Sequence, residues 1–137
     1  MTAPGPWTAS STNHSYTLPA GSGAPWTLPG RRAALVGTAG DGLLHAWIHP
    51  YRVVQDVTLL VGGAATAPVR VSVSPEQVVR SSLAHGGAVT ERWTVALEHP
   101  MMVWQVEVPD GVPISLEWTV DIGSAAPPPE CLPAADR

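Results

Sequence analysis

The chain contains no lysine and no phenylalanine, one cysteine, and few charged residues for its length of 137 residues. Charged residues make up 13% of the sequence, which is roughly half the share found in an average soluble domain. All basic residues are arginine, only Arg31 and Arg32 are adjacent, and the formal net charge is -4. Because nucleic acids and anionic membranes both attract clustered positive charge, we expect neither kind of partner.

The single cysteine, Cys131, cannot form an internal disulfide, so nothing in the sequence indicates an oxidising compartment. The first residues lack the basic start and the apolar stretch of a secretory signal. No apolar run reaches the roughly 18 residues that a membrane-spanning helix needs, since Gly62 and Gly63 directly follow the run at 57–61. These absences predict a cytoplasmic protein with no membrane partner.

Glycine and proline are abundant, with 13 and 15 residues, and they interrupt every stretch long enough for an amphipathic helix. Alternation of apolar and polar residues instead indicates β-strands, most regularly from Ile114 to Ile122. Further strands are predicted at 33–38, 43–48, 53–61, 69–73, 77–82, 89–98 and 102–108. We therefore expect an all-β fold, an antiparallel β-sandwich of about eight strands with no substantial helix.

Two details of the strand arrangement can also be predicted. Short connections join the strands at 89–98, 102–108 and 114–122, which favours a three-stranded antiparallel meander. The strand at 53–61 is more continuously apolar, as a central strand covered on both faces would be.

The two ends of the chain differ in composition from its middle. Residues 1–15 are rich in Ser, Thr, Ala and Pro without periodicity, and we expect a flexible N-terminal segment there. Residues 16–123 are expected to form the β-sandwich domain. Residues 124–137 are expected to be a Pro/Ala-rich tail or a truncated linker.

The sequence shows no catalytic constellation, so no catalytic residue, metal or cofactor is predicted. His45 and His49 share one face of a predicted strand, but about 13 Å of strand separates them, too far for one metal ion. Glu91 stands among inward-facing apolar positions, where an arginine partner or a strand edge explains it as well as catalysis does. Motifs for a nucleophilic serine or a phosphate-binding glycine loop are absent from the sequence. A role other than catalysis is favoured, with enzymatic activity left open.

Aromatic residues are the most informative set, with six Trp and two Tyr. Alternation directs Trp93, Trp104 and Trp118 toward the core. Trp26 and Tyr51, with its neighbour Arg52, lie in loop-like sequence beside prolines. These three are the candidate ligand-binding residues, since Trp and Tyr combine an apolar face with a polar group. Packing of Trp26 over one end of the sandwich is the alternative.

A series of segments in the first half of the chain carries a resemblance to a known family. The segments are Asn13-His14-Ser15-Tyr16-Thr17-Leu18-Pro19, Trp26, the stretch 29–38, Asp41-Gly42 and the stretch 46–52. They are similar to the N-terminal β-sandwich of bacterial glycoside hydrolases in which an (α/α)6 barrel follows, related to glucoamylases and glycogen-debranching enzymes. The resemblance implies a non-catalytic domain, because the catalytic acids of those enzymes lie in the barrel, which this sequence does not contain.

Three functions are therefore considered. The leading one is a non-catalytic module that packs against a helical-barrel partner domain or against itself. The low content of charged residues favours a homo-oligomer, most simply a dimer. The second is a free-standing carbohydrate-binding module that uses the loop aromatics. The third is a small metal-dependent β-barrel enzyme of the cupin type, in which His45, His49 and a further ligand would meet at one ion.

Overall fold

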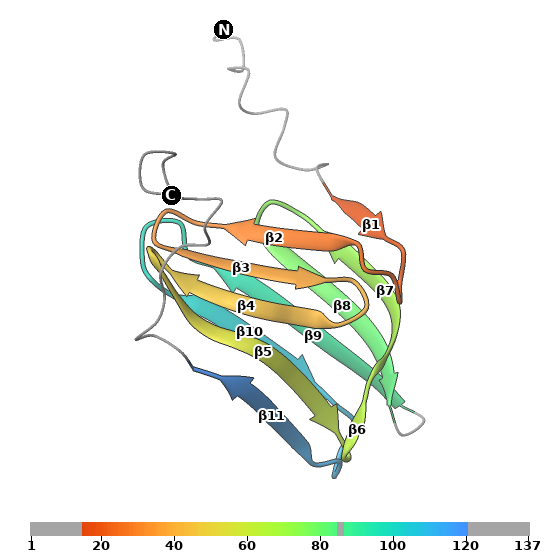
Figure 1. Cartoon of the computed structure of the whole chain (residues 1–137). Helices are drawn as coiled ribbons and strands as arrows, with labels where there is room; N and C mark the ends of the chain where they lie inside the picture. The colour runs from red at the N-terminus through yellow and green to blue at the C-terminus, as the bar shows by residue number, and fades with distance from the viewer. Residues whose placement is uncertain (1–14, 85–86, 121–137) are drawn as a thin grey trace, which may run out of the picture.

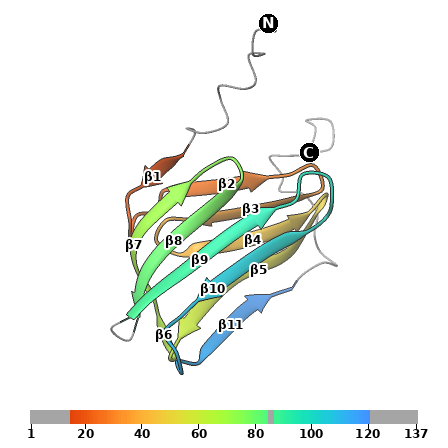
Figure 2. The same cartoon turned by 180° about the vertical axis from the view of Figure 1, so that it is seen from behind.

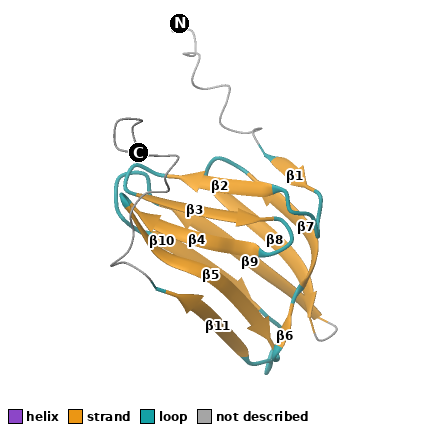
Figure 3. Cartoon of the chain, viewed as in Figure 1, coloured by secondary structure: helices purple, strands orange, loops and turns teal. Residues whose placement is uncertain are grey.

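The computed structural model describes residues 15–84 and 87–120, which form two antiparallel β-sheets packed face to face without a helix (Figures 1 and 3). The strands in chain order are β1 (Tyr16–Leu18), β2 (Pro25–Pro29), β3 (Ala33–Thr38), β4 (Gly42–Ile48), β5 (Tyr51–Val61), β6 (Ala64–Ala65), β7 (Ala67–Val73), β8 (Gln77–Ala84), β9 (Gly87–Val95), β10 (Met102–Glu107) and β11 (Ile114–Thr119). The expected all-β sandwich is confirmed.

The first sheet has the strand order β1-β7-β8-β9-β10, and the second has the order β11-β5-β4-β3-β2, with β6 paired to β5. Each of the predicted strands corresponds to one of β3, β4, β5 and β7 to β11. β1, β2 and β6 were not predicted from the sequence. Prolines at both ends of β2 concealed it, yet Pro25 and Pro29 are exposed on an edge strand, where a missing N–H is tolerated.

The predicted meander is wrong for its third strand. β9 and β10 pair as expected, but β11 crosses to the second sheet and pairs with β5. The connection contains Pro109, Pro113 and Gly111, whose positive φ of 76° suits glycine. The backbone N–H of Gly62 donates to the carbonyl oxygen of Pro113 at 2.7 Å, which fixes the start of β11 beside the end of β5. Among the described strands, none pairs with the outer edge of β10.

β5 is central in its sheet, but it is not covered on both faces as predicted. Asp56 and Thr58 are exposed, whereas Val57 is buried. Asp56 has a positive φ of 53°, and the register with β11 shifts at this point, so that Asp56 and Val57 together oppose Trp118. This β-bulge resets the alternation and allows Val54 and Val57 both to face the interior. The bulge therefore explains why Val54 and Val57, three residues apart, face the same side of the sheet.

Tryptophan side chains form the centre of the core. The rings of Trp26 and Trp93 lie 5.0 Å apart between centroids, and those of Trp93 and Trp104 lie 5.7 Å apart. Trp26 is opposite Gly37 in the register of β2 and β3, and its indole N–H donates to the carbonyl oxygen of Thr38 at 3.1 Å. Aliphatic residues of both sheets surround the rings, namely Leu28, Leu35, Leu43, Val57, Val71, Val73 and Val78.

The two sheets do not cover one another completely. β9 and β10 pack over β2 and β3. As a result β11 projects past the edge of the first sheet, as both views show (Figures 1 and 2). The core therefore lies under β9, and the side of the sandwich between β10 and β11 is open.

Candidate functional site

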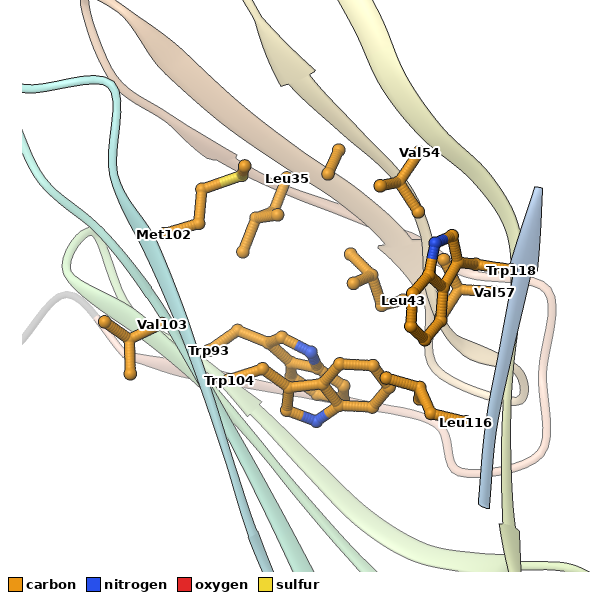
Figure 4. Close-up of a pocket in the computed structure, with 11 residues that line it drawn as sticks. Leu35, Leu43, Val54, Val57, Trp93, Met102, Val103, Trp104, Leu116 and Trp118 are labelled. Carbon is orange, nitrogen blue, oxygen red and sulfur yellow. The ribbon is translucent and has the colours of Figure 1, made fainter. Parts of the chain in front are cut away.

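An apolar cavity of about 200 Å³ lies between the sheets on this open side. Figure 4 shows Trp93 and Trp104 at one wall and Leu116 and Trp118 of β11 at the other. Its lining residues are all apolar or aromatic and come from β3, β4, β5, β9, β10 and β11, namely Leu35, Leu43, Ala46, Val54, Val57, Trp93, Met102, Val103, Trp104, Leu116 and Trp118. Such a cavity suits apolar groups, because it provides scarcely any hydrogen-bonding partners.

The apolar face of β11 is exposed although its alternation is regular. The exposed fractions are 50% for Ile114, 41% for Leu116, 51% for Trp118 and 55% for Val120. Val103 of β10 is also exposed, but it alternates with the inward-facing Met102 and Trp104 and points away from the cavity (Figure 4). We call Ile114, Leu116, Trp118 and Val120 the open-side patch. Contiguous apolar exposure of this kind marks interaction surfaces more often than isolated apolar residues do.

The strands at both margins of the open side have a free backbone edge within the described part of the chain. β10 pairs only with β9, and β11 pairs only with β5. Free edges are commonly protected by proline, lysine or a bulge in the strand itself. β11 contains neither proline nor lysine, and Glu117 is its only charged residue. The open side thus offers apolar side chains and unpaired backbone groups together.

A second notable feature is a buried ion pair between neighbouring strands. Arg80 of β8 and Glu91 of β9 are opposite one another in the sheet, and both are almost completely buried. Arg80 Nη1 donates to Glu91 Oε1 at 2.6 Å and to Thr66 Oγ1 at 2.9 Å. Its Nε donates to the carbonyl oxygen of Ala39 at 3.1 Å, and its Nη2 donates to that of Gly40. Arg80 therefore joins β9, the β3–β4 turn and the segment before β7.

Burial raises the pKa of the Glu91 carboxyl above its ordinary value, and the charge and hydrogen bond of Arg80 offset this only in part. An arginine partner, one of the explanations that the sequence allowed for an inward-facing Glu91, is therefore present. Each nitrogen of the Arg80 guanidinium already donates to a protein acceptor. The pair therefore acts as a structural anchor.

A polar cavity of about 340 Å³ adjoins Arg80 and includes Asp41, Asp56 and Thr58 in its lining. Asp41 is held locally, because its carboxylate accepts from Thr38 Oγ1 at 3.2 Å. Both aspartates are exposed at its rim. Solvated carboxylates beside a neutralised arginine form a weakly specific site.

The three candidate ligand-binding residues are not brought together. Trp26 lies in β2 rather than in a loop, and it is 1% exposed, so its ring cannot offer a stacking surface. Tyr51 begins β5 after the cis peptide bond between His49 and Pro50, and it is 51% exposed. The Arg52 guanidinium lies 6.0 Å from the ring centroid of Trp47. Two strands separate β2 from β5, so Trp26 belongs to the core, whereas Tyr51 and Arg52 lie at the start of β5 and, as successive strand residues, point to opposite faces.

The predicted inward direction of the other tryptophans is correct for all three, but their burial differs. Trp93 is fully buried, Trp104 is half-buried, and Trp118 is half exposed at the opening of the cavity. His45 is half-buried and His49 is exposed. Within residues 15–84 and 87–120, no group of three or more His, Cys, Asp or Glu side chains could hold a metal ion.

The described residues include no helix that is long and apolar enough to span a membrane. Comparisons of the chain with protein-family models, with curated proteins and with solved structures find no match.

Proposed function

We propose that this protein is a non-catalytic β-sandwich module that docks through its open side onto another protein surface. The observation that carries the proposal is the exposure of Leu116 and Trp118, at 41% and 51%. Both belong to a strand in which apolar and polar residues alternate as they do in strands with one buried face. Burial of apolar surface releases roughly 25 cal/mol per Å², so covering this patch is favourable.

A protein partner fits the patch better than a carbohydrate does. Sugar rings stack on tryptophan, but their hydroxyl groups also need hydrogen-bonding side chains nearby. The cavity behind Trp118 is lined by Leu, Val, Ala, Met and Trp, so it offers almost no such groups. Apolar side chains of a protein need none, and the unpaired edges of β10 and β11 can accept backbone groups as well.

The resemblance to glycoside hydrolases supports the same proposal and suggests a lineage. In that lineage the implied role of the sandwich is to brace a helical barrel. A helical-barrel domain and a second sandwich are therefore the two classes of protein partner to consider.

Site-specific photo-crosslinking in the cells that naturally produce the protein tests the proposal. A benzophenone amino acid replaces Trp118 in one variant and Thr27 in the control, since Thr27 is exposed on β2, an edge strand of the same sheet. Irradiated adducts are purified and identified by mass spectrometry. We expect one defined polypeptide to be joined at position 118 and none at position 27.

The absence of any adduct at position 118, with the protein folded and expressed, would contradict docking through this side. A titration with maltoheptaose followed by tryptophan fluorescence covers the carbohydrate alternative. A saturable change that Tyr51→Ala abolishes would support carbohydrate binding at the Tyr51 surface instead.

A further inference from the structure

We infer that the partner at the open side is a second copy of this chain, paired β11 to β11 in antiparallel fashion about a two-fold axis at Leu116. The inference rests on the proposed docking function and specifies its partner.

The free edge of β11 favours a β-strand as the occupant. Its outer backbone groups pair with no strand among residues 15–84 and 87–120, and its sequence carries no proline or lysine that would block another strand. An occupant that brought only side chains would cover the patch but leave those backbone groups to water. An added strand pairs the backbone edge and also sets its own apolar side chains beside those of the patch.

The sequence of β11 matches itself in one antiparallel register. With Leu116 opposite Leu116 of the second copy, Ile114 lies opposite Trp118, and Ser115 lies opposite Glu117. Residues opposite one another in an antiparallel pair share a face, so every apolar residue then meets an apolar one.

The neighbouring registers of a β11–β11 pair are less favourable. An axis at Glu117 places two carboxylates directly opposite each other, which is destabilising. An axis at Ser115 places Pro113 opposite Glu117 and leaves Trp118 beyond the other copy's strand. An axis between two residues puts apolar side chains opposite polar ones. In the Leu116 register, the single charged residue of each β11 lies opposite a serine, so no like charges meet within the strand pair.

The geometry of this pairing also brings the two open-side patches together on one face. A two-fold axis through antiparallel strands runs perpendicular to the sheet, so the inner faces of both copies lie on the same side. The second sheet of each copy then continues into that of the other, and the two cavities adjoin. Leu116 and Trp118 of both copies come together in one apolar layer.

A charge-exchange experiment tests both the partner and the register. Sedimentation velocity of the full chain over a concentration series is measured for the wild type, Leu116→Lys, Leu116→Glu and an equimolar mixture of the two variants. Leu83→Lys is the matched control, because Leu83 is a similarly exposed leucine on β8. Circular dichroism verifies that each variant is folded.

We expect a dimer for the wild type and for the control. Each Leu116 variant should associate at least about tenfold more weakly, since like charges would be opposed at the axis. The mixture should restore the dimer, because Lys and Glu then lie opposite each other.

Three results would overturn the inference. The first is a wild type that stays monomeric up to the millimolar range. The second is a dimer that persists in both Leu116 variants, which would show that another surface mediates it. The third is a mixture that stays monomeric although the wild type is dimeric. If the wild type is monomeric but position 118 crosslinks to a different identified protein, only this inference fails. If position 118 crosslinks to nothing, the proposed function fails with it.

Discussion

Replacement of Arg80 by methionine leaves Glu91 buried without its cation and should destabilise the fold strongly. Met has a similar length, so the main loss is electrostatic rather than steric. Arg80 and Glu91 are 3% and 1% exposed, so water cannot easily replace the guanidinium. The carbonyl oxygens of Ala39 and Gly40 lose their donors as well.

The magnitude follows from these contacts. Removal of one member of a buried ion pair costs about 3–5 kcal/mol, because the other charge is left uncompensated. The buried carbonyl of Ala39 adds about 1 kcal/mol or more once its donor is lost. A loss of at least about 4 kcal/mol is a large part of the roughly 5–15 kcal/mol that stabilises a typical domain.

Urea unfolding monitored by tryptophan fluorescence measures this loss. For an m value of about 2 kcal/mol per M, the midpoint should fall by about 2 M. Arg70→Met is the control, since Arg70 is exposed on β7, and the change there should stay within about 0.5 kcal/mol. The double variant Arg80→Met with Glu91→Leu should recover part of the loss, because no lone charge remains.

The pH dependence of the Arg80→Met variant gives an independent test. Without Arg80, the pKa of Glu91 rises further in the folded state. A carboxyl whose pKa is raised by folding stabilises the fold at pH values below the pKa that it has in the unfolded chain, about 4.5. This contribution is lost as the pH rises through the pKa of the carboxyl in the folded protein. The loss caused by Arg80→Met should therefore be smaller at pH 4 than at pH 7. A loss below about 1 kcal/mol at pH 7, or one equal at both pH values, would refute this reasoning.

Three further predictions follow from particular contacts. In a urea titration, Gly37→Ala should lower the free energy of unfolding by about 1–3 kcal/mol, because the added Cβ would overlap the Trp26 ring. Gly23→Ala is the control, since the Cβ added there meets no atom and the change should be neutral. Glu91→Gln should flatten the fall in stability above pH 4.5, since burial raises the pKa of Glu91; an unchanged pH profile would contradict this. Trp26→Ala should lower the free energy of unfolding, measured by calorimetry, by about 3–5 kcal/mol. Trp118→Ala in a variant kept monomeric should lower it much less, and equal losses would contradict the assigned burial of the two side chains.

The sequence was sufficient to predict the fold class, because alternation is local and breakers exclude helices. It could not predict that β11 leaves the meander, since the pairing partner of a strand depends on distant residues. The bulge at Asp56 was equally hidden, because a positive φ at an aspartate leaves no clear mark in composition. β2 was obscured by the prolines that bound it.

The candidate sites likewise depend on contacts between distant residues, which the sequence alone does not reveal. Glu91 was recognised as unusual from its neighbours, and an arginine partner was among the explanations, but identifying Arg80 required the pairing of β8 with β9. Alternation gave the direction of Trp118 correctly. Its exposure depends on the offset between the sheets, which no local pattern encodes. The open-side patch therefore became visible only in the structure.

Hydrogen–deuterium exchange of the wild-type protein, compared between dilute and concentrated samples, tests the central claim most directly. Four strands form the outer edges of the two sheets in the described residues: β1, β2, β10 and β11. If the open side is the docking surface and the partner is a second copy, concentration should slow the exchange of the 114–119 amides while β1 and β2 remain unchanged. Protection confined to β1 or β2 would contradict the account, because a different face of the sandwich would then be the one that is covered.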